Sequence, residues 1–303
     1  MKPPPVEYHR PTTEEEALGL LREHGDEARV LAGGQSLVPL LNFRLSAPGH
    51  LVDITQIASL AFIRARGQRL LIGAATRQSA VERSPLIAGR WPLLRKAIEH
   101  VGHPQTRSRG TVGGSVAHAD PAAELPVALA ALNGRVHLRS ARGTRIVDWT
   151  DFFRAQFITA CAADEMVTGV EMPAPRAQTG VSFREHAARH GDFAVAGAAS
   201  VISLDEDGRC AYASLALLGC GPGPIRAREA ESALVGTTFS RKAAAAAAAT
   251  ALFAAEFRGG HTDLPAEYRR RVLRALVEQT LVDAAGTATE AMAGGSAHGA
   301  SRG

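Results

Sequence analysis

The chain has 303 residues, of which 46% are hydrophobic, enough for a sizeable core in two or three compact units. Its formal net charge of +4 comes from arginines spread along the sequence without a long basic run, which argues against nucleic-acid binding. No apolar run approaches the about 20 residues that a membrane helix needs, and no signal peptide opens the chain. We therefore expect a soluble cytoplasmic protein.

The first 56 residues predict a small α/β subdomain. Thr13 and Glu16 have the spacing of a capping box, and Gly25 is placed to end the helix that follows. Strands are expected at residues 28–31 and 50–54, on either side of a glycine pair and a short helix.

Residues 57–175 predict a second subdomain that mixes helices with antiparallel strands. Two hairpins are expected, at residues 62–73 and 136–147, and a closing strand at 166–172. Helices are expected at residues 91–101 and 122–132, because each apolar stripe ends at a Gly or Asn-Gly stop.

Residues 173–180, Pro-Ala-Pro-Arg-Ala-Gln-Thr-Gly, form the clearest linker, and a third domain is expected at 176–285. Strands at 181–185, 194–204 and 210–218 can form a three-stranded antiparallel meander, and helices follow around 227–234, 241–257 and 266–284. Ser240 can cap the alanine-rich helix. The tail at 286–303, rich in Gly, Ala and Ser, is expected to be disordered.

Two glycine pairs share one pattern. Gly33-Gly34 and Gly113-Gly114 each follow an apolar or strand-like approach and lead to a serine, Ser36 or Ser115. Glycine permits positive φ and removes the β-carbon that would hold a ligand away from peptide N–H groups. Two unrelated tight turns are the alternative. The repetition favours one anion site, of the kind that holds a phosphate or pyrophosphate.

The other candidate ligands do not form a metal site. Cys161, Cys210 and Cys220 are widely spaced without a Cys-x-x-Cys pattern, so we expect small buried residues rather than disulfides or cluster ligands. His103 and His118 flank the second glycine pair, but no third ligand has suitable spacing. The sequence therefore predicts no metal on this chain.

An ordered set of motifs resembles a known family. The segments at 31–37 (Leu-Ala-Gly-Gly-Gln-Ser-Leu), 72–76, 109–115 and 119–126, with later ones at 190–194, 224–227 and 267–271, are similar to the FAD-binding medium subunit of the molybdenum hydroxylases, of the carbon monoxide dehydrogenase and xanthine dehydrogenase type. The resemblance covers roughly residues 1–285. It implies an α+β fold: a vanillyl-alcohol-oxidase (PCMH) type FAD-binding fold of two subdomains, plus a C-terminal domain of three-stranded antiparallel sheet with a helical bundle.

The resemblance also implies the cofactor site. Both glycine segments would cradle the FAD pyrophosphate, while Asp120 and Glu124 would accept hydrogen bonds from ribityl and ribose hydroxyls. Phe193 would stack on the isoalloxazine ring. The implied cofactor-binding residues are Ala32, Gly33, Gly34, Gln35, Ser36, Leu37, Ala74, Thr76, Gly110, Thr111, Val112, Gly113, Gly114, Ser115, Asp120, Glu124, Asp192 and Phe193.

Several of these residues have a plainer alternative. Asp120 could be a helix cap, Glu124 a first-turn helix residue, and Phe193 a core residue of the meander. Ala74 and Thr76 could simply end a strand. These alternatives stay open at the level of sequence.

Two segments depart from the family pattern. Family members often carry a lysine shortly before the Gly191-Asp192 pair, where this chain has Phe-Arg-Glu-His at 183–186, so the resemblance does not extend to flavin tuning near Glu185. Covalently flavinylated relatives of the wider fold use a histidine in the first glycine segment. Gln35 stands in that neighbourhood, so the expected FAD is non-covalent.

The implied function is that of the electron-exit subunit of a three-component enzyme. Hydroxylation would occur on a large molybdopterin-binding subunit, electrons would cross [2Fe-2S] clusters on a small subunit, and FAD on this chain would pass them to NAD, a quinone or oxygen. No catalytic residue is expected on the chain itself, because the flavin supplies the chemistry. A dimer of heterotrimers is implied. The alternatives are a free-standing flavin oxidoreductase of the same fold and a degenerate, non-catalytic scaffold.

Overall fold

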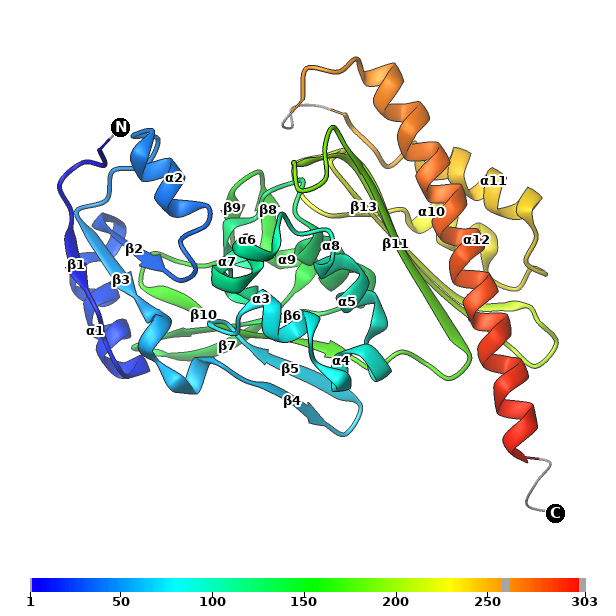
Figure 1. Ribbon diagram of the computed structural model, residues 1–303, viewed down its shortest axis with the longest axis horizontal. Helices are drawn as coiled ribbons and strands as arrows, with labels where there is room; N and C mark the ends of the chain where they lie inside the picture. The colour runs from blue at the N-terminus through cyan, green and yellow to red at the C-terminus, as the bar shows by residue number, and fades with distance from the viewer. Residues whose placement is uncertain (1, 258–261, 300–303) are drawn as a thin grey trace. The chain divides into compact units, whose positions relative to one another are not determined.

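The computed structural model describes residues 2–257 and 262–299. The chain forms two compact units, drawn in Figure 1. Unit 1 comprises residues 1–84, 102–120 and 133–173, and unit 2 comprises residues 85–101, 121–132 and 174–303. The last crossing from unit 1 to unit 2, after Pro173, falls in the segment predicted to be a linker. Within the described ranges no helix is both long and apolar enough to cross a membrane.

A three-stranded parallel sheet begins unit 1. Strands β1 (Glu7–His9), β3 (His50–Asp53) and β2 (Ala28–Leu31) lie in the order β1-β3-β2. Helix α1 (Glu14–His24) packs its apolar side chains into the core of this sheet. Its capping box is complete, with the Thr13 side chain accepting from the Glu16 N–H. The predicted helix and both predicted strands are confirmed, whereas β1 was too short for the sequence pattern to indicate.

An antiparallel sheet forms the rest of the framework of unit 1. Its strands are β4 (Ile63–Arg66), β5 (Arg69–Gly73), β10 (Glu165–Pro173), β6 (Arg135–Ser140) and β7 (Gly143–Asp148), in that spatial order. Strand β10 is the last of them in the chain yet lies at the centre, paired antiparallel with β5 and β6. The closing strand therefore joins the two predicted hairpins, which are confirmed.

Short elements complete unit 1. They are the helices α2 (Leu37–Asn42), α3 (Gln78–Glu82), α6 (Pro104–Arg109), α7 (Val112–His118) and α9 (Trp149–Phe152), the strands β8 (Phe153–Ala155) and β9 (Ile158–Thr159), and three 3₁₀ turns at Gly25–Glu27, Ile54–Gln56 and Ala58–Leu60. The buried guanidinium of Arg107 donates to both carboxylate oxygens of Glu82, at 3.0 and 2.9 Å. This bidentate pair ties α6 to α3 and so fixes the approach to the second glycine segment.

The sheet of unit 2 is an antiparallel meander with one added strand. Its order is β11 (Thr179–Ala187), β12 (Ala194–Leu204), β13 (Cys210–Leu218) and β14 (Ile225–Arg226). The predicted three strands are confirmed, and the two-residue β14 makes the sheet four-stranded rather than three-stranded. Every residue of β12 is buried, so both faces of the sheet are covered.

The helices of unit 2 pack on this sheet or on one another. They are α4 (Pro85–Arg90), α5 (Pro92–Ile98), α8 (Glu124–Ala131), α10 (Arg228–Leu234), α11 (Arg241–Ala251) and α12 (Ala266–Gly299). Helix α12 lies along β11 and β12 (Figure 1). It approaches so closely that a Cβ on Gly180 would overlap the carbonyl of Ala284. The predicted cap of α11 is confirmed, because the Ser240 hydroxyl accepts from the Ala243 N–H at 3.1 Å.

Two predicted helix ends are wrong. Helix α12 continues to Gly299, so the expectation of disorder fails for residues 286–299, while residues 300–303 lie outside the described chain. The helix continues because Ala288 is fully buried in the core of unit 2, with Met292 packed against it. Helix α11 ends at Ala251 instead of near residue 257, because the Glu256 and Phe257 N–H groups turn to the Cys220 carbonyl.

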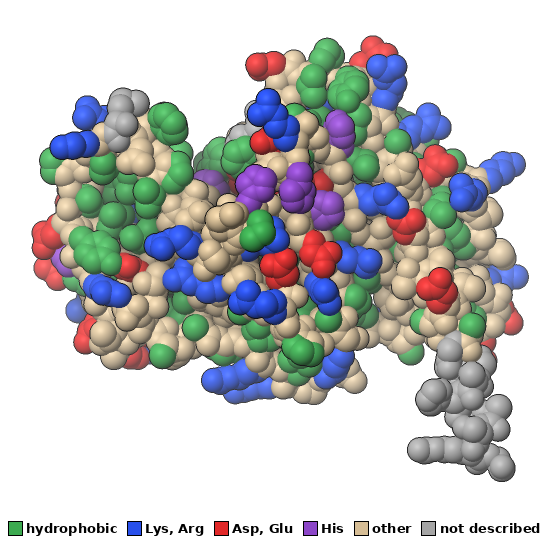
Figure 2. Space-filling view, in the orientation of Figure 1, with side chains coloured by type: hydrophobic (Ala, Val, Ile, Leu, Met, Phe, Trp, Pro, Cys, Tyr) green, Lys and Arg blue, Asp and Glu red, His purple; other side chains and the backbone are tan. Residues whose placement is uncertain are grey.

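Charged side chains of both signs are interspersed over the face shown in Figure 2. This mixing agrees with the scattered arginines of the sequence.

Candidate cofactor site

The two glycine segments lie directly against each other in unit 1. A Cβ on Gly33 would lie 2.7 Å from Gly110 Cα and closer still to the Arg109 carbonyl oxygen. A Cβ on Gly114 would lie 3.6 Å from the Ala32 Cβ. Only glycine allows this approach of backbone to backbone. The structure thus brings together the two pairs that the sequence assigned to one anion site.

The first segment keeps its peptide N–H groups available. Between β2 and α2, the N–H groups of residues 33–37 take no hydrogen-bond partner within the described chain. Gly34 has a φ of +73°, and regular helical bonding starts only with the Val38 N–H, which donates to the Gly34 carbonyl at 3.1 Å. The Ser36 side chain makes no capping bond. Consecutive unbonded N–H groups on a partly exposed turn are what an anion-binding concavity offers.

The second segment uses its N–H groups inside the chain. Gly113 and Gly114 lie in helix α7, so the tight-turn alternative is wrong for this pair. The Gly114 N–H donates to the Thr111 hydroxyl at 3.1 Å and the Gly113 N–H to the Ala74 carbonyl at 2.9 Å. The neighbouring donors are also bonded, with Gly110 to Thr106, Val112 to Thr76 and Ser115 to Thr111.

The glycines of the second segment serve close packing instead. A Cβ on Gly113 would lie 2.6 Å from Ala74 Cα, and one on Gly110 would lie 2.5 Å from the Gln78 amide oxygen. Helix α7 can therefore sit against the chain that leaves β5 only because these side chains are missing. This second segment forms the wall on which the first segment rests.

Ala74 and Thr76 directly follow β5, which ends at Gly73. Both are buried, and the Thr76 hydroxyl donates to the Phe62 carbonyl at 2.9 Å and accepts from the Phe62 N–H at 3.0 Å. The Thr76 hydroxyl thus holds the loop before β4, and Ala74 supplies the surface against which Gly113 packs.

The two predicted carboxylates have distinct settings. Asp120 is 4% exposed in unit 1 and follows Ala119, which has a left-handed φ of +52°. Helix α8 has Ala123 at its N-cap, without a side-chain capping bond, so the helix-cap alternative for Asp120 is wrong. Glu124, in unit 2, is the first residue of α8 and is 8% exposed, an unusual degree of burial for a carboxylate.

The Gly-Asp-Phe segment forms the loop between β11 and β12 of unit 2. Gly191 has a φ of +88°, and the Asp192 N–H donates to the Arg189 carbonyl at 3.1 Å. The Phe193 side chain is 61% exposed, so the alternative that it belongs to the core is wrong. The Phe193 ring thus lies largely at the surface of this loop.

Two residues beside the second segment were missed from the sequence. The Arg77 guanidinium donates to the Arg109 carbonyl, and the Gln78 N–H donates to the Gly110 carbonyl at 2.9 Å. The buried amide oxygen of Gln78 has no hydrogen-bond partner among the described residues. Their position immediately after the 72–76 motif was the available signal.

The three cysteines are free, and Cys210 and Cys220 are buried. Burial raises the pKa of the Cys161 and Cys220 thiols to about 12 and also raises the pKa of Cys210. All three are therefore protonated thiols at neutral pH, and the thiolate is the form that ligates metals and attacks electrophiles.

Comparisons with known proteins agree with this architecture. The family model of the FAD binding domain in molybdopterin dehydrogenase matches residues 4–175, and that of the CO dehydrogenase flavoprotein C-terminal domain matches residues 181–284. The chain is 43% identical, over 94% of its length and 96% of the relative's, to the 6-hydroxypseudooxynicotine dehydrogenase complex subunit alpha of Paenarthrobacter nicotinovorans.

Two carbon monoxide dehydrogenases are similar over nearly the whole chain. The medium chain from Afipia carboxidovorans is 35% identical over 93% of this chain and 97% of its own length. A solved chain of the enzyme from Hydrogenophaga pseudoflava, in a form lacking the Mo-pyranopterin moiety of the molybdenum cofactor, has a TM-score of 0.91 at 35% identity, over 95% of this chain and 99% of its own.

The chain combines a framework of helices and sheets with paired glycine segments, and it matches these families and relatives. Together these observations define its class as a flavin-dependent oxidoreductase subunit. The chain belongs to the family of FAD-binding domains of molybdopterin dehydrogenases. Within it, this is an FAD-binding medium subunit that acts in electron transfer. The relatives are named as subunits or medium chains of dehydrogenase complexes.

Proposed function

We propose that the chain holds FAD through a division of labour between its two glycine segments. The first segment, residues 32–37, contacts the pyrophosphate with its peptide N–H groups and the Ser36 hydroxyl. The second, residues 110–115, supplies the surface that fixes the first segment's position. The row of unbonded N–H groups at residues 33–37, braced on Gly110, is the observation that carries the proposal. The cradle fits a diphosphate because its consecutive unbonded N–H groups form an anion-binding turn, and the missing β-carbon of Gly33 lets that turn lie against Gly110.

The remaining residues hold the other parts of the cofactor. Ala74 and Thr76 pack against the second segment and support it. Asp120 and Glu124 accept hydrogen bonds from sugar hydroxyls. Phe193 stacks on the flavin ring from the loop that Asp192 shapes. The burial of both carboxylates and the exposure of the phenyl ring support these roles.

When bound, FAD supplies the redox chemistry that links one-electron donors to an external acceptor. The residues of this chain bind the cofactor, orient it and exclude water from one side of it. We propose that iron–sulfur clusters of the small subunit deliver the electrons, and that hydroxylation takes place on the large molybdopterin-binding subunit. The FAD is non-covalent, because Gln35 replaces the histidine to which covalently bound flavin is attached in the wider fold.

The finer architecture belongs to the same proposal. We assign residues 1–56 and 57–175 to the two subdomains of a PCMH-type FAD-binding fold, and residues 176–285 to the C-terminal domain. The family models that meet between residues 175 and 181 support the last boundary. A dimer of heterotrimers is the assembly we propose. The cytoplasmic location stays a prediction.

Flavin content of the purified full chain tests the cradle. We expect Gly34→Val and Gly114→Val to lose FAD. A Cβ at position 34 would lie 3.1 Å from Val38 Cγ2 on a residue with positive φ, and one at position 114 would lie 2.8 Å from the Thr111 hydroxyl. Gly19→Val is the matched control, since a Cβ there would meet nothing within 4 Å. The readouts are the flavin absorbance per chain and the release of that flavin on acid precipitation.

Normal flavin content in both variants would contradict the cradle. Flavin that stays with the precipitated protein would contradict non-covalent binding. Turnover of an organic substrate by the isolated chain would favour a free-standing oxidoreductase over the electron-transfer subunit.

A further inference from the structure

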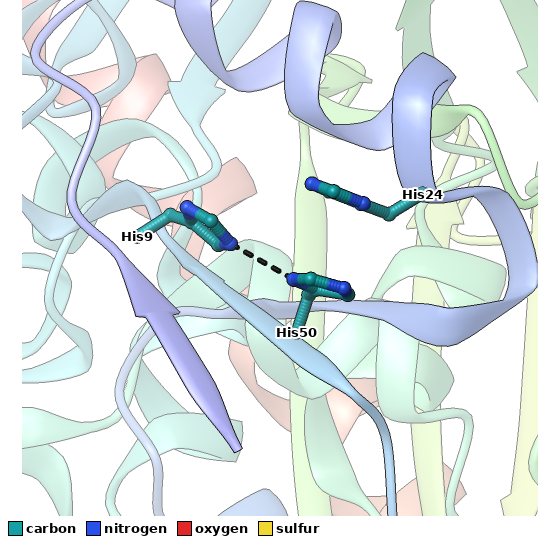
Figure 3. A group of neighbouring side chains, drawn as sticks. All are labelled: His9, His24 and His50. Carbon is teal, nitrogen blue, oxygen red and sulfur yellow. Dashed lines mark hydrogen bonds between the residues drawn. The ribbon is translucent and has the colours of Figure 1, made fainter.

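Three histidines gather in unit 1 on elements that the glycine segments do not use (Figure 3). His9 ends β1, His24 ends α1 and His50 begins β3. One ring nitrogen from each lies within 4.8 Å of the others. The His9 Nε2 and His50 Nδ1 atoms are hydrogen-bonded at 3.0 Å, and the His24 and His50 rings stack with centroids 3.6 Å apart.

The strand register explains why this cluster forms. Parallel pairing of β1 with β3 sets Glu7 opposite His50, and His9, two residues later, points to the same face as Glu7. On the other side of β3, the small Ala28 lies opposite His50 and leaves room for the rings. The Glu7 carboxylate lies 3.8 Å from His9 Nε2 and 3.6 Å from His50 Nδ1.

The cluster has more nitrogen donors and acceptors than it uses. The side chains of His9 and His50 are only 18% and 17% exposed, and the three rings share a single hydrogen bond among the described residues. Apolar side chains would fill this space without leaving ring nitrogens unbonded. Imidazoles that converge with a carboxylate beside them are instead the donor set of a transition-metal site.

We propose that His9, His24 and His50 bind one divalent transition-metal ion, with the Glu7 carboxylate or a water as the fourth ligand. Tetrahedral Zn²⁺ with bonds of about 2.0–2.1 Å sets two nitrogen ligands about 3.3 Å apart. The 3.0 Å separation of the His9 and His50 nitrogens is close to this value. His24 lies at the end of α1 and reaches the ion by rotating its side chain. Its ring then no longer stacks on the ring of His50.

The ion would join three elements of the N-terminal sheet. Strand β1 is an edge strand of three residues, so few backbone hydrogen bonds hold it. A metal bridge from His9 to His50 and His24 ties this strand and the end of α1 to β3. The site is therefore structural, and it departs from the sequence prediction of no metal, because ligands on three separate elements leave no spacing signal.

Metal titration of the full chain, purified without a polyhistidine tag and stripped with a chelator, tests the site. We expect one Co²⁺ per chain, with the intense visible d–d absorption of a tetrahedral nitrogen site, and displacement of Co²⁺ by Zn²⁺. Loss of an outer-shell partner costs about 10–100-fold in metal affinity, so His9→Gln, His24→Gln and His50→Gln should each cost at least about 100-fold. His103→Gln, at an exposed histidine of the same unit, is the control and should leave the affinity unchanged.

Thermal unfolding gives an independent readout. Zn²⁺ should raise the melting temperature of the wild-type chain and of His103→Gln, but not that of His24→Gln, because only bound metal stabilises the folded state. His24 ends its helix and is half-buried, so its replacement should still fold. Absence of Co²⁺ uptake by the wild-type chain, or uptake unchanged in all three glutamine variants, would overturn the proposal.

Discussion

The two glycine segments of unit 1 look alike in sequence and differ in use. Residues 33–37 leave their N–H groups unbonded after β2, whereas residues 112–115 bond theirs to Thr111 and to the chain that leaves β5. The first segment can therefore hold an anion, and the second can hold the first. A Gly-Gly pair followed by serine indicates a close backbone approach, and only the surrounding hydrogen bonds decide what approaches.

The largest effect should come from Gly113→Val. The new Cβ would lie 2.6 Å from Ala74 Cα, and the Ala74 backbone cannot retreat because its N–H is bonded to the Thr168 carbonyl at 2.9 Å. Overpacking costs about 1–3 kcal/mol where side chains can shift, so a backbone collision should cost at least about 3 kcal/mol of unfolding free energy. Urea unfolding followed by circular dichroism measures this. An unfolding midpoint equal to that of Gly19→Val would show that the second segment is not a packing wall.

Gly34→Ala should weaken FAD binding clearly while destabilising the fold only modestly. A φ of +73° costs an alanine about 1–2 kcal/mol, and its Cβ would lie 3.1 Å from Val38 Cγ2. The fold should survive with that modest loss. The N–H row should turn away from the ligand, so we expect FAD affinity to fall at least about tenfold, or about 1.4 kcal/mol. Flavin fluorescence titration of the apoprotein measures it, and an unchanged FAD affinity would contradict the division of labour.

Local signals predicted most of the fold. The capping box of Thr13 and Glu16 and the cap at Ser240 are local contacts, and both appear where the sequence indicates them. Non-local contacts produced the errors. The tail at 286–299 is helical because Ala288 enters a core built by distant strands, and α11 ends early because the Cys220 carbonyl takes two later N–H groups.

The candidate site divides in the same way. The prediction of one anion site required the two glycine segments to lie together, and Gly33 does lie against Gly110. The sequence pattern does not show which N–H groups of the second segment are already bonded. Their acceptors, the Ala74 and Thr76 carbonyls, lie just after the β4–β5 hairpin, far away in the chain. For the same reason Arg77 and Gln78 were missed. Their contacts with the second segment exist only once β5 and α7 are packed together.

Thr111→Val should affect stability more than binding. The Thr111 hydroxyl caps α7 by accepting from the Gly114 N–H, and valine keeps the shape while removing the acceptor. Loss of a cap costs about 1 kcal/mol. We expect that loss in urea unfolding, with FAD affinity reduced no more than about twofold to threefold, equivalent to about 0.4–0.6 kcal/mol. A loss of FAD as large as that of Gly34→Ala would place Thr111 among the direct ligands.

Ser36→Ala should give the smallest change in stability and a clear one in binding. The Ser36 side chain makes no capping bond, so its loss should change the unfolding free energy by less than about 0.5 kcal/mol. Ser240→Ala is the matched control, because Ser240 does cap its helix and its loss should cost about 1 kcal/mol. If the Ser36 hydroxyl contacts the pyrophosphate, its removal forfeits a hydrogen bond to a charged group, worth about 1.5–3 kcal/mol, so FAD affinity should fall at least about tenfold. Unchanged FAD affinity would mean that only the peptide N–H groups bind the pyrophosphate. Ser36, the serine that follows the first glycine pair, would then have no role in binding.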